Sequence, residues 1–224
     1  MENSFWHEKW KKNQLGFHLD DVHPLLKKYF NKIFSTTDPI FVPLCGKTLD
    51  MRYLLSQNRS IVGCELSEIA VKDFYTPENE KKTLQLDKND KFSIYSSAEN
   101  NLTSKIIVGD YFDLATSDLN SCTGIYDRAS LIALPKDVRI KYVELLKHLV
   151  PKAKMLLITL DYDQNIMTGP PFSVNKNEVE SLFSFANIEL LKRSNIIEEE
   201  PQFKSKGLTE FNQSAYYIEW DLTR

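Results

Sequence analysis

Charged side chains stand just after several apolar runs of the sequence, at positions where the strands of a buried sheet would end. Glu65 follows one such run, Asp110 follows a second and Arg128 follows a third. In a parallel sheet, ligands bind outside the carboxyl ends of the strands, so these three side chains are placed to meet a bound molecule. An acid there can accept the two hydroxyls of a ribose, an acid beside an aromatic ring can bracket a purine, and an arginine can hold an anion.

Each of these positions also has a simpler interpretation. Glu65 fits an ordinary strand–helix–strand unit with an exposed glutamate. Asp110 fits a plain turn that places Phe112 in the core, and Arg128 fits a surface ion pair with Asp127. The residues alone leave both interpretations open.

The segment 40–65 has the pattern of a strand, a tight turn, a helix and a second strand. Gly46 lets a ligand approach the backbone closely, and Glu65 lies 19 positions further along the chain. This turn has one glycine, whereas a dinucleotide site needs three spaced glycines, and no phosphate-binding Gly-x4-Gly-Lys-Ser/Thr loop follows. A nucleoside without a phosphate chain is therefore favoured, and S-adenosylmethionine is the commonest cofactor of that kind.

Apolar runs that alternate with helical patterns predict an α/β fold. The N-terminal segment 4–13 is expected to be a helix with Trp6 and Trp10 on one face, which is either packed on the core or a lid over a ligand. The charged segment 78–90 is interpreted as part of an insertion covering 78–101. The expected strands are 40–44, 61–64, 105–108, 123–126, 155–160, 188–191 and 215–222, with 92–95 as a short extra strand.

Length and composition point to one compact domain spanning 1–224. The formal net charge of −3 gives no basic footprint for nucleic acid, and no apolar run approaches the length of a membrane span. The three cysteines are odd in number and widely spaced, which favours reduced thiols over a disulfide framework or a zinc site. We therefore expect a cytoplasmic protein that binds neither metal, membrane nor nucleic acid.

Several blocks together resemble the thiopurine S-methyltransferase family, its bacterial branch most closely. They occur in matching order along nearly the whole chain: FWHEKWKKNQLGFH, VPLCGKTLDM, IVGCELSEIAV, GDYFDL, YDRASLIALP, LITLDY, GPPFSV and EEEPQFKSKGLTEF. The resemblance implies a single-domain, Rossmann-like class I methyltransferase. Its mostly parallel sheet would have seven strands, with helices on both faces and the last strand antiparallel, behind an N-terminal helical lid segment at 1–36.

The resemblance also assigns roles to individual residues. Arg128 would face both cofactor and acceptor, which makes it the candidate catalytic residue, and Phe17 would lie on the acceptor side. Residues of the turns after the strands, together with one tryptophan of the lid, would bind the cofactor: Trp10, Leu44, Gly46, Glu65, Leu66, Asp110, Tyr111 and Arg128.

The activity implied is S-adenosylmethionine-dependent methyl transfer to the sulfur of small aromatic or heterocyclic thiols such as thiopurines, with S-adenosylhomocysteine as product and no metal. Oxyanions of selenium or tellurium are a further open class of acceptor, and the chain is expected to be a monomer. Two alternatives remain: a nicotinamide-dependent oxidoreductase, which the missing glycine fingerprint disfavours, and a non-catalytic nucleoside-binding protein.

Overall fold

The computed structural model describes residues 3–223 apart from 15, 17, 77–83 and 120. The chain divides into two compact units, Met1–Tyr126 and Asp127–Arg224. Strands and helices alternate in both units, as the sequence predicts, so the α/β class is confirmed. Among the described residues there are nine strands rather than the seven expected.

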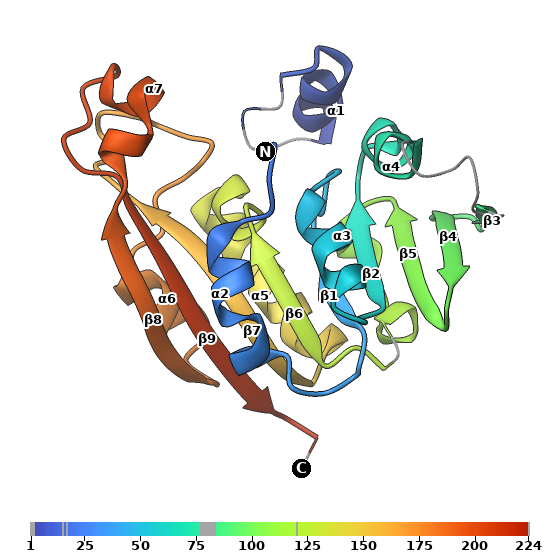
Figure 1. Ribbon diagram of the computed structural model, residues 1–224. Helices are drawn as coiled ribbons and strands as arrows, with labels where there is room; N and C mark the ends of the chain where they lie inside the picture. The colour runs from blue at the N-terminus through green and yellow to red at the C-terminus, as the bar shows by residue number, and fades with distance from the viewer. Residues whose placement is uncertain (1–2, 15, 17, 77–83, 120, 224) are drawn as a thin grey trace. The chain divides into compact units, whose positions relative to one another are not determined.

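The first unit holds the amino-terminal helices and most of the parallel strands (Figure 1). Its strands are hydrogen-bonded in the order β3-β4-β5-β2-β1-β6, and β6 crosses the boundary into the second unit. In chain order, its elements are α1 (Asn3–Lys11), α2 (Pro24–Ile33), β1 (Ile40–Val42), α3 (Leu49–Ser56), β2 (Ile61–Glu65), α4 (Glu68–Tyr75), β3 (Gln85–Lys88), β4 (Ser93–Glu99), β5 (Leu102–Val108) and β6 (Gly124–Arg128).

Parallel pairing brings the ends of three strands to one edge. β1 pairs with β2 from Ile40↔Ile61 onward, and β2 pairs with β5 up to Glu65↔Val108. All residues of β1 and β2 are buried, as expected for strands covered on both faces. In Figure 1 the arrowheads of β2 and β5 point toward the side on which α1 and α4 lie. The turns after β1, β2 and β5 are therefore neighbours.

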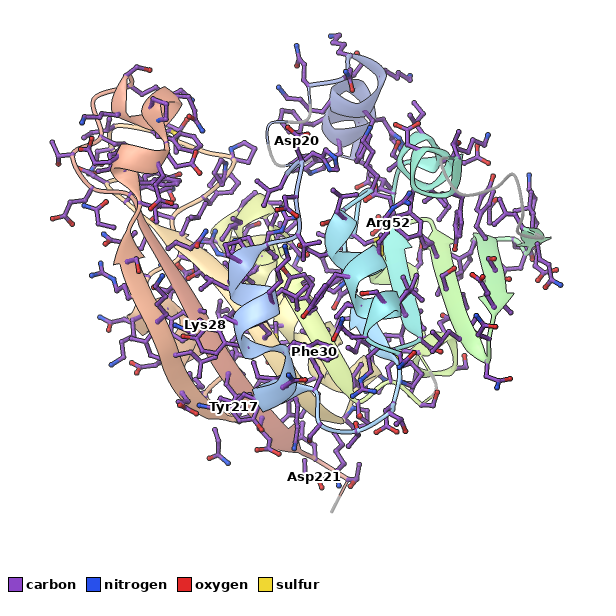
Figure 2. All side chains as sticks on the ribbon, viewed as in Figure 1. Asp20, Lys28, Phe30, Arg52, Tyr217 and Asp221 are labelled. Carbon is purple, nitrogen blue, oxygen red and sulfur yellow. The ribbon has the colours of Figure 1, made fainter. Side chains whose placement is uncertain are left out.

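Helices α2 and α3 pack through aromatic rings. Phe30 of α2 meets the ring of Tyr53 edge-on, with 5.8 Å between ring centroids, and the Arg59 guanidinium lies 5.5 Å from the Phe30 centroid. Figure 2 shows Phe30 and Arg52 on their helices. Arg52 lies over the Phe74 ring of α4 at 5.2 Å, so α3 and α4 are tied together in the same way.

The hairpin β3–β4 accounts for the higher strand count. β4 pairs antiparallel with β5 and with β3, so it adds a longer strand than the run 92–95 predicted. β3 falls inside the charged segment 78–90, which was expected to be part of an insertion, and all four of its residues are exposed. Phe92, just before β4, packs so closely on Gly109 that a Cβ there would lie 2.5 Å from the ring.

The second unit is built on antiparallel strands (Figure 1). β9 pairs antiparallel with both β7 and β8, in the order β7-β9-β8, so the expectation of an antiparallel last strand is confirmed. Beyond the end of β7, a small cluster of Tyr162, Met167, Ile197, Leu208 and Phe211 forms a core of its own. The remaining elements of the unit are α5 (Lys136–Leu149), β7 (Lys152–Asp161), α6 (Lys176–Leu182), β8 (Asn187–Asn195), α7 (Pro201–Lys204) and β9 (Asn212–Asp221).

No helix in the part of the chain that the structure describes is both long enough and apolar enough to span a membrane.

Candidate active site

Glu65 ends β2 with its carboxylate fixed by two backbone donors. Its Oε2 accepts the Gly46 N–H at 2.8 Å, and its Oε1 accepts the Ser67 N–H at 2.7 Å. The residue is only 6 % exposed, so it is not the exposed glutamate of the simpler interpretation. A carboxylate oxygen has two lone pairs, and each oxygen of Glu65 therefore keeps room for a second donor. The site thus presents a held acid that can still accept two hydroxyl groups.

The ionisation of Glu65 reflects the same surroundings. Burial raises the pKa of this carboxyl above its usual value of 4.5, while the amides of Ser67, Gly46 and Leu66 oppose the rise by stabilising the ionised form. Leu66, half-buried, follows immediately.

The turn after β1 is bent by two left-handed residues. Leu44 has a φ of 43° and Gly46 a φ of 55°, in a region that residues with a Cβ seldom adopt. Between them, the Cys45 N–H donates to the Cys64 carbonyl at 2.9 Å, which ties the turn to β2. This conformation aims the Gly46 N–H at Glu65 and so carries the predicted glycine into the site.

Asp110 and Tyr111 form the turn after β5. The Gly109 N–H donates to the Glu65 carbonyl at 3.0 Å, so this turn lies directly beside the end of β2. Tyr111 is buried and stacks on Phe41 of β1, with 6.5 Å between centroids, whereas Phe112 is 42 % exposed. The alternative interpretation that placed Phe112 in the core is therefore wrong, and Tyr111 fills that place.

Helix α1 reaches this turn. Asn3 Nδ2 donates to Asp110 Oδ2 at 2.8 Å, while Asp110 Oδ1 accepts the Phe112 N–H. Trp10 is 5 % exposed, and α1 also contacts α4. In this structure α1 is packed against α4 of the same unit, and its action as a lid stays a prediction. Phe17 lies outside the described residues.

Arg128 is the last residue of β6 and is half-buried at the start of the second unit. The Asp127 side chain before it is fully buried, so the interpretation of the two as a surface ion pair is wrong. Asp127 Oδ1 accepts the N–H groups of Ser130 and Leu131 at 3.2 Å each, and its Oδ2 accepts the Tyr142 hydroxyl at 2.7 Å. Burial raises the pKa of the Asp127 carboxyl, and the hydrogen bonds from Tyr142, Leu131 and Ser130 act against the rise.

The first unit therefore brings Leu44, Gly46, Glu65, Leu66, Asp110 and Tyr111 to one edge of its sheet, on turns that are hydrogen-bonded to one another. Three contacts of the site were not predictable from the sequence: the Ser67 N–H donated to Glu65, the contact of Asn3 with Asp110 and that of Tyr142 with Asp127. Every residue except proline has a backbone N–H, so the residue type at position 67 does not indicate that its amide binds Glu65. Among the described residues, no group of three or more His, Cys, Asp or Glu side chains is arranged to hold a metal ion.

The family model of thiopurine S-methyltransferase matches residues 1–221 of this chain. A thiopurine S-methyltransferase of Aliivibrio fischeri is 42 % identical, over 98 % of this chain and all of the relative. One from Vibrio atlanticus is 44 % identical over 96 % of each chain.

Solved structures with a similar fold include a 1,6-didemethyltoxoflavin N1-methyltransferase of Burkholderia thailandensis. It has a TM-score of 0.61 and 11 % identity, and the match covers 98 % of this chain and 87 % of that one. An S-adenosylmethionine-dependent methyltransferase of Anabaena variabilis has a TM-score of 0.57 and 13 % identity, and the match covers 97 % of this chain and 94 % of that one. At such low identity these two support the fold alone.

Proposed function

Because the chain belongs to the thiopurine S-methyltransferase family and is an S-adenosylmethionine-dependent methyltransferase, we propose that it methylates the sulfur of a small aromatic or heterocyclic thiol. The observation that supports the site most strongly is the buried Glu65 carboxylate, which the amides of Gly46 and Ser67 hold with acceptor capacity to spare. The acceptor class is inferred from relatives at 42–44 % identity that carry the name thiopurine S-methyltransferase.

In this proposal Glu65 accepts the two ribose hydroxyls of the cofactor through its remaining lone pairs. Leu66, next to it, packs against the adenine. Asp110 and Tyr111 border the adenine on the other side, because their turn is hydrogen-bonded to the end of β2. The left-handed turn at Leu44 and Gly46 leaves backbone groups accessible for the methionine portion.

Helix α1 would close over this region. Its Trp10 presents an aromatic ring, and a sulfonium is a cation of the kind that an aromatic ring attracts. The contact of Asn3 with Asp110 brings α1 to the turn that is proposed to border the adenine.

Arg128 is proposed to hold the anionic acceptor. β6 pairs in parallel with β1 at Ile40↔Gly124 and ends on Arg128, so this guanidinium follows a strand that runs in the same direction as β1. A guanidinium stays protonated and binds planar anions through paired donors. A positive charge near an aromatic thiol also favours its thiolate form. Phe17 is proposed to line the acceptor side.

S-adenosylmethionine supplies a methyl group activated by its positively charged sulfur. Transfer to a thiolate forms one S–C bond and breaks one, giving a thioether and S-adenosylhomocysteine. The chain's own share is to place the acceptor sulfur in line with the methyl group and to exclude water. Such positioning is worth about 7–11 kcal/mol in favourable cases. No side chain of the protein has to form a covalent bond.

The experiment is an assay of purified protein with S-adenosylmethionine and matched acceptors. A thiopurine and thiophenol are compared with the corresponding oxopurine and phenol, and selenite and tellurite form a third group. Release of S-adenosylhomocysteine should require the thiols and be negligible with the oxygen analogues. A preference for the oxygen analogues would contradict sulfur as the acceptor atom, and turnover of the metalloid oxyanions would extend the acceptor range.

The same preparation tests the two alternatives. Cofactor binding without turnover of any acceptor would support a non-catalytic nucleoside-binding protein. Binding of NADH in preference to S-adenosylhomocysteine would support an oxidoreductase. The monomeric state and cytoplasmic location stay predictions, and size-exclusion chromatography with light scattering tests the first of them.

A further inference from the structure

The carboxylate of Asp127 organises the chain on both sides of Arg128. Asp127 is fully buried at the end of β6, and the amides it accepts belong to Ser130 and Leu131, two and three residues beyond Arg128. The carboxylate thereby closes a tight loop with Arg128 and Ala129 at its tip. The position of the Arg128 backbone is fixed from the strand on one side and from this loop on the other.

The loop contains a conformation that needs support. Ala129 has a φ of 74°, in the left-handed region that a residue with a Cβ seldom adopts. Such a residue persists only where its surroundings hold it, and the two hydrogen bonds to Asp127 span it. Without them, the backbone next to Arg128 would relax toward an ordinary conformation and turn the arginine side chain away from its present direction.

Helix α5 holds the same segment with two buried polar side chains. The Tyr142 hydroxyl donates to Asp127 Oδ2 at 2.7 Å, and Tyr142 is fully buried. One turn earlier, Arg139 donates through Nη1 to the Leu134 carbonyl at 2.8 Å and through Nε to Glu178 at 2.8 Å. The loop after β6 is thus anchored at its start by Tyr142 and at its end by Arg139.

We propose that Asp127 and Tyr142 are positioning residues for the acceptor: they fix the loop that aims Arg128 and do not themselves touch either substrate. This inference rests on the proposed role of Arg128 in holding the acceptor anion. It assigns acceptor specificity to the buried pair Asp127 and Tyr142. The rate of methyl transfer to the acceptor would then depend on the Tyr142 hydroxyl, which solvent does not reach.

The test compares Tyr142→Phe and Asp127→Asn with a matched control, Tyr126→Phe. Tyr126 is also buried on β6, and its hydroxyl donates to a different buried carboxylate, Asp50 Oδ2, at 2.9 Å. Each Tyr→Phe change therefore removes one hydroxyl from one buried aspartate, with a comparable loss of stability. Only Tyr142→Phe removes a hydrogen bond from the carboxylate that closes the loop carrying Arg128.

We expect Tyr142→Phe to lower kcat/KM for an aromatic thiol roughly 10- to 100-fold, because a small misplacement of a positioning group is that costly. The Kd for S-adenosylhomocysteine should change by less than about twofold. Tyr126→Phe should lower the melting temperature without this loss in kcat/KM. Asp127→Asn keeps a carbonyl acceptor for the two loop amides, so it provides a folded second variant and should show a smaller loss than Tyr142→Phe.

A double-mutant cycle with Arg128→Ala separates positioning from stability. If Tyr142 acts through Arg128, adding Tyr142→Phe to Arg128→Ala should lower kcat/KM little further, while the stability losses still add. Equal kcat/KM losses in Tyr142→Phe and Tyr126→Phe, or additive kcat/KM losses in the cycle, would overturn the positioning role and leave Arg128 in place. If Arg128→Ala itself leaves acceptor use unchanged, the role of Arg128 fails and the positioning role fails with it.

Discussion

Glu65 contributes to the proposed site through a carboxylate whose position is set before a ligand arrives. Its two oxygens are held by amides from two different turns, and no rotamer has to be fixed on binding. Such preorganisation improves affinity because the cost of ordering the side chain has already been met in folding. The sequence could predict the acid and Gly46, since both are visible as residue types. It could not predict the Ser67 amide.

Replacement of Glu65 by glutamine should weaken cofactor binding by more than its loss of charge suggests. A glutamine has one acceptor atom and one donor group, so its NH2 would face the N–H of either Gly46 or Ser67. Loss of a hydrogen bond to a charged group costs about 1.5–3 kcal/mol, which corresponds to at least tenfold in Kd. Calorimetry with S-adenosylhomocysteine measures this change.

Glu68→Gln is the matched control for Glu65→Gln. Glu68 begins α4, three residues after Glu65. It accepts the Tyr95 hydroxyl and pairs with Lys72, so its replacement removes an equal charge nearby without touching the proposed ribose position. Its Kd should stay close to that of the unchanged protein. Equal Kd values for Glu65→Gln and Glu68→Gln would remove Glu65 from the cofactor site.

Cofactor affinity should also depend on pH through Glu65. Burial raises its pKa above the usual 4.5, so acidification protonates it at a higher pH than an exposed glutamate and removes an acceptor for the ribose. An acid with a raised pKa favours the folded state below its unfolded pKa, and that contribution is lost as pH rises through the folded pKa. Acidification therefore weakens binding through Glu65 without destabilising the fold through Glu65.

Titrations with S-adenosylhomocysteine between about pH 5 and pH 8 test this expectation. The Kd of the unchanged protein should rise as the pH is lowered, and the Kd of Glu65→Gln should change less with pH. Parallel profiles for the two proteins would mean that a different group carries the pH dependence.

At the scale of elements, apolar runs predicted the buried strands and failed at the exposed edge. β1 and β2 were predictable because every residue in them is buried. The four residues of β3 are all exposed, and apolar and polar side chains do not alternate along it as they do in a half-buried strand. It is a strand because β4 supplies hydrogen bonds along its length. The start of α2 shows the same limit: His23 caps it by accepting the Leu25 N–H, although histidine is not one of the residue types that usually cap helices.

Helix α1 should respond to the cofactor if it acts as a lid. It touches the proposed adenine turn through Asn3 and buries Trp10, so a bound cofactor would add contacts beneath it. Hydrogen exchange of the α1 amides should slow markedly on addition of S-adenosylhomocysteine, because local opening would then break those contacts as well. The amides of α2, which packs on α3 through Phe30, serve as the internal reference. Exchange in α1 that is already slow and unaffected by ligand would identify it as a static packing element.

At the scale of the whole molecule, the cofactor-side residues and Arg128 belong to different compact units. Residues 44–46, 65–66 and 110–111 supply the turns of the first unit. Arg128 lies at the start of the second unit, where Tyr142 of α5 holds the neighbouring Asp127. No composition shift or linker marks this boundary in the sequence, because β6 runs through it. A single domain spanning 1–224 stays a prediction.

Cooperativity of unfolding tests that prediction. Phe211 lies in the small cluster of the second unit, stacked on Phe203 with 4.4 Å between centroids, and Phe211→Ala should cost about 3–5 kcal/mol there. In a Trp220→Phe background the remaining tryptophans, Trp6 and Trp10, report on the first unit. If the chain unfolds as one domain, Phe211→Ala should lower the denaturation midpoint of this fluorescence and of circular dichroism equally. A fluorescence midpoint that does not move would indicate two domains that unfold independently.

The most direct measurement of the central claim follows the methyl group itself. The protein is incubated with S-adenosylmethionine labelled with ¹³C in the methyl group and with a thiopurine that offers both sulfur and ring nitrogens, and the product is identified by NMR. Methyl transfer to sulfur predicts that all of the transferred label appears as a single S-methyl resonance, with one S-adenosylhomocysteine formed for each methyl group transferred. Label on a ring nitrogen, or S-adenosylhomocysteine released without a methylated product, would contradict it.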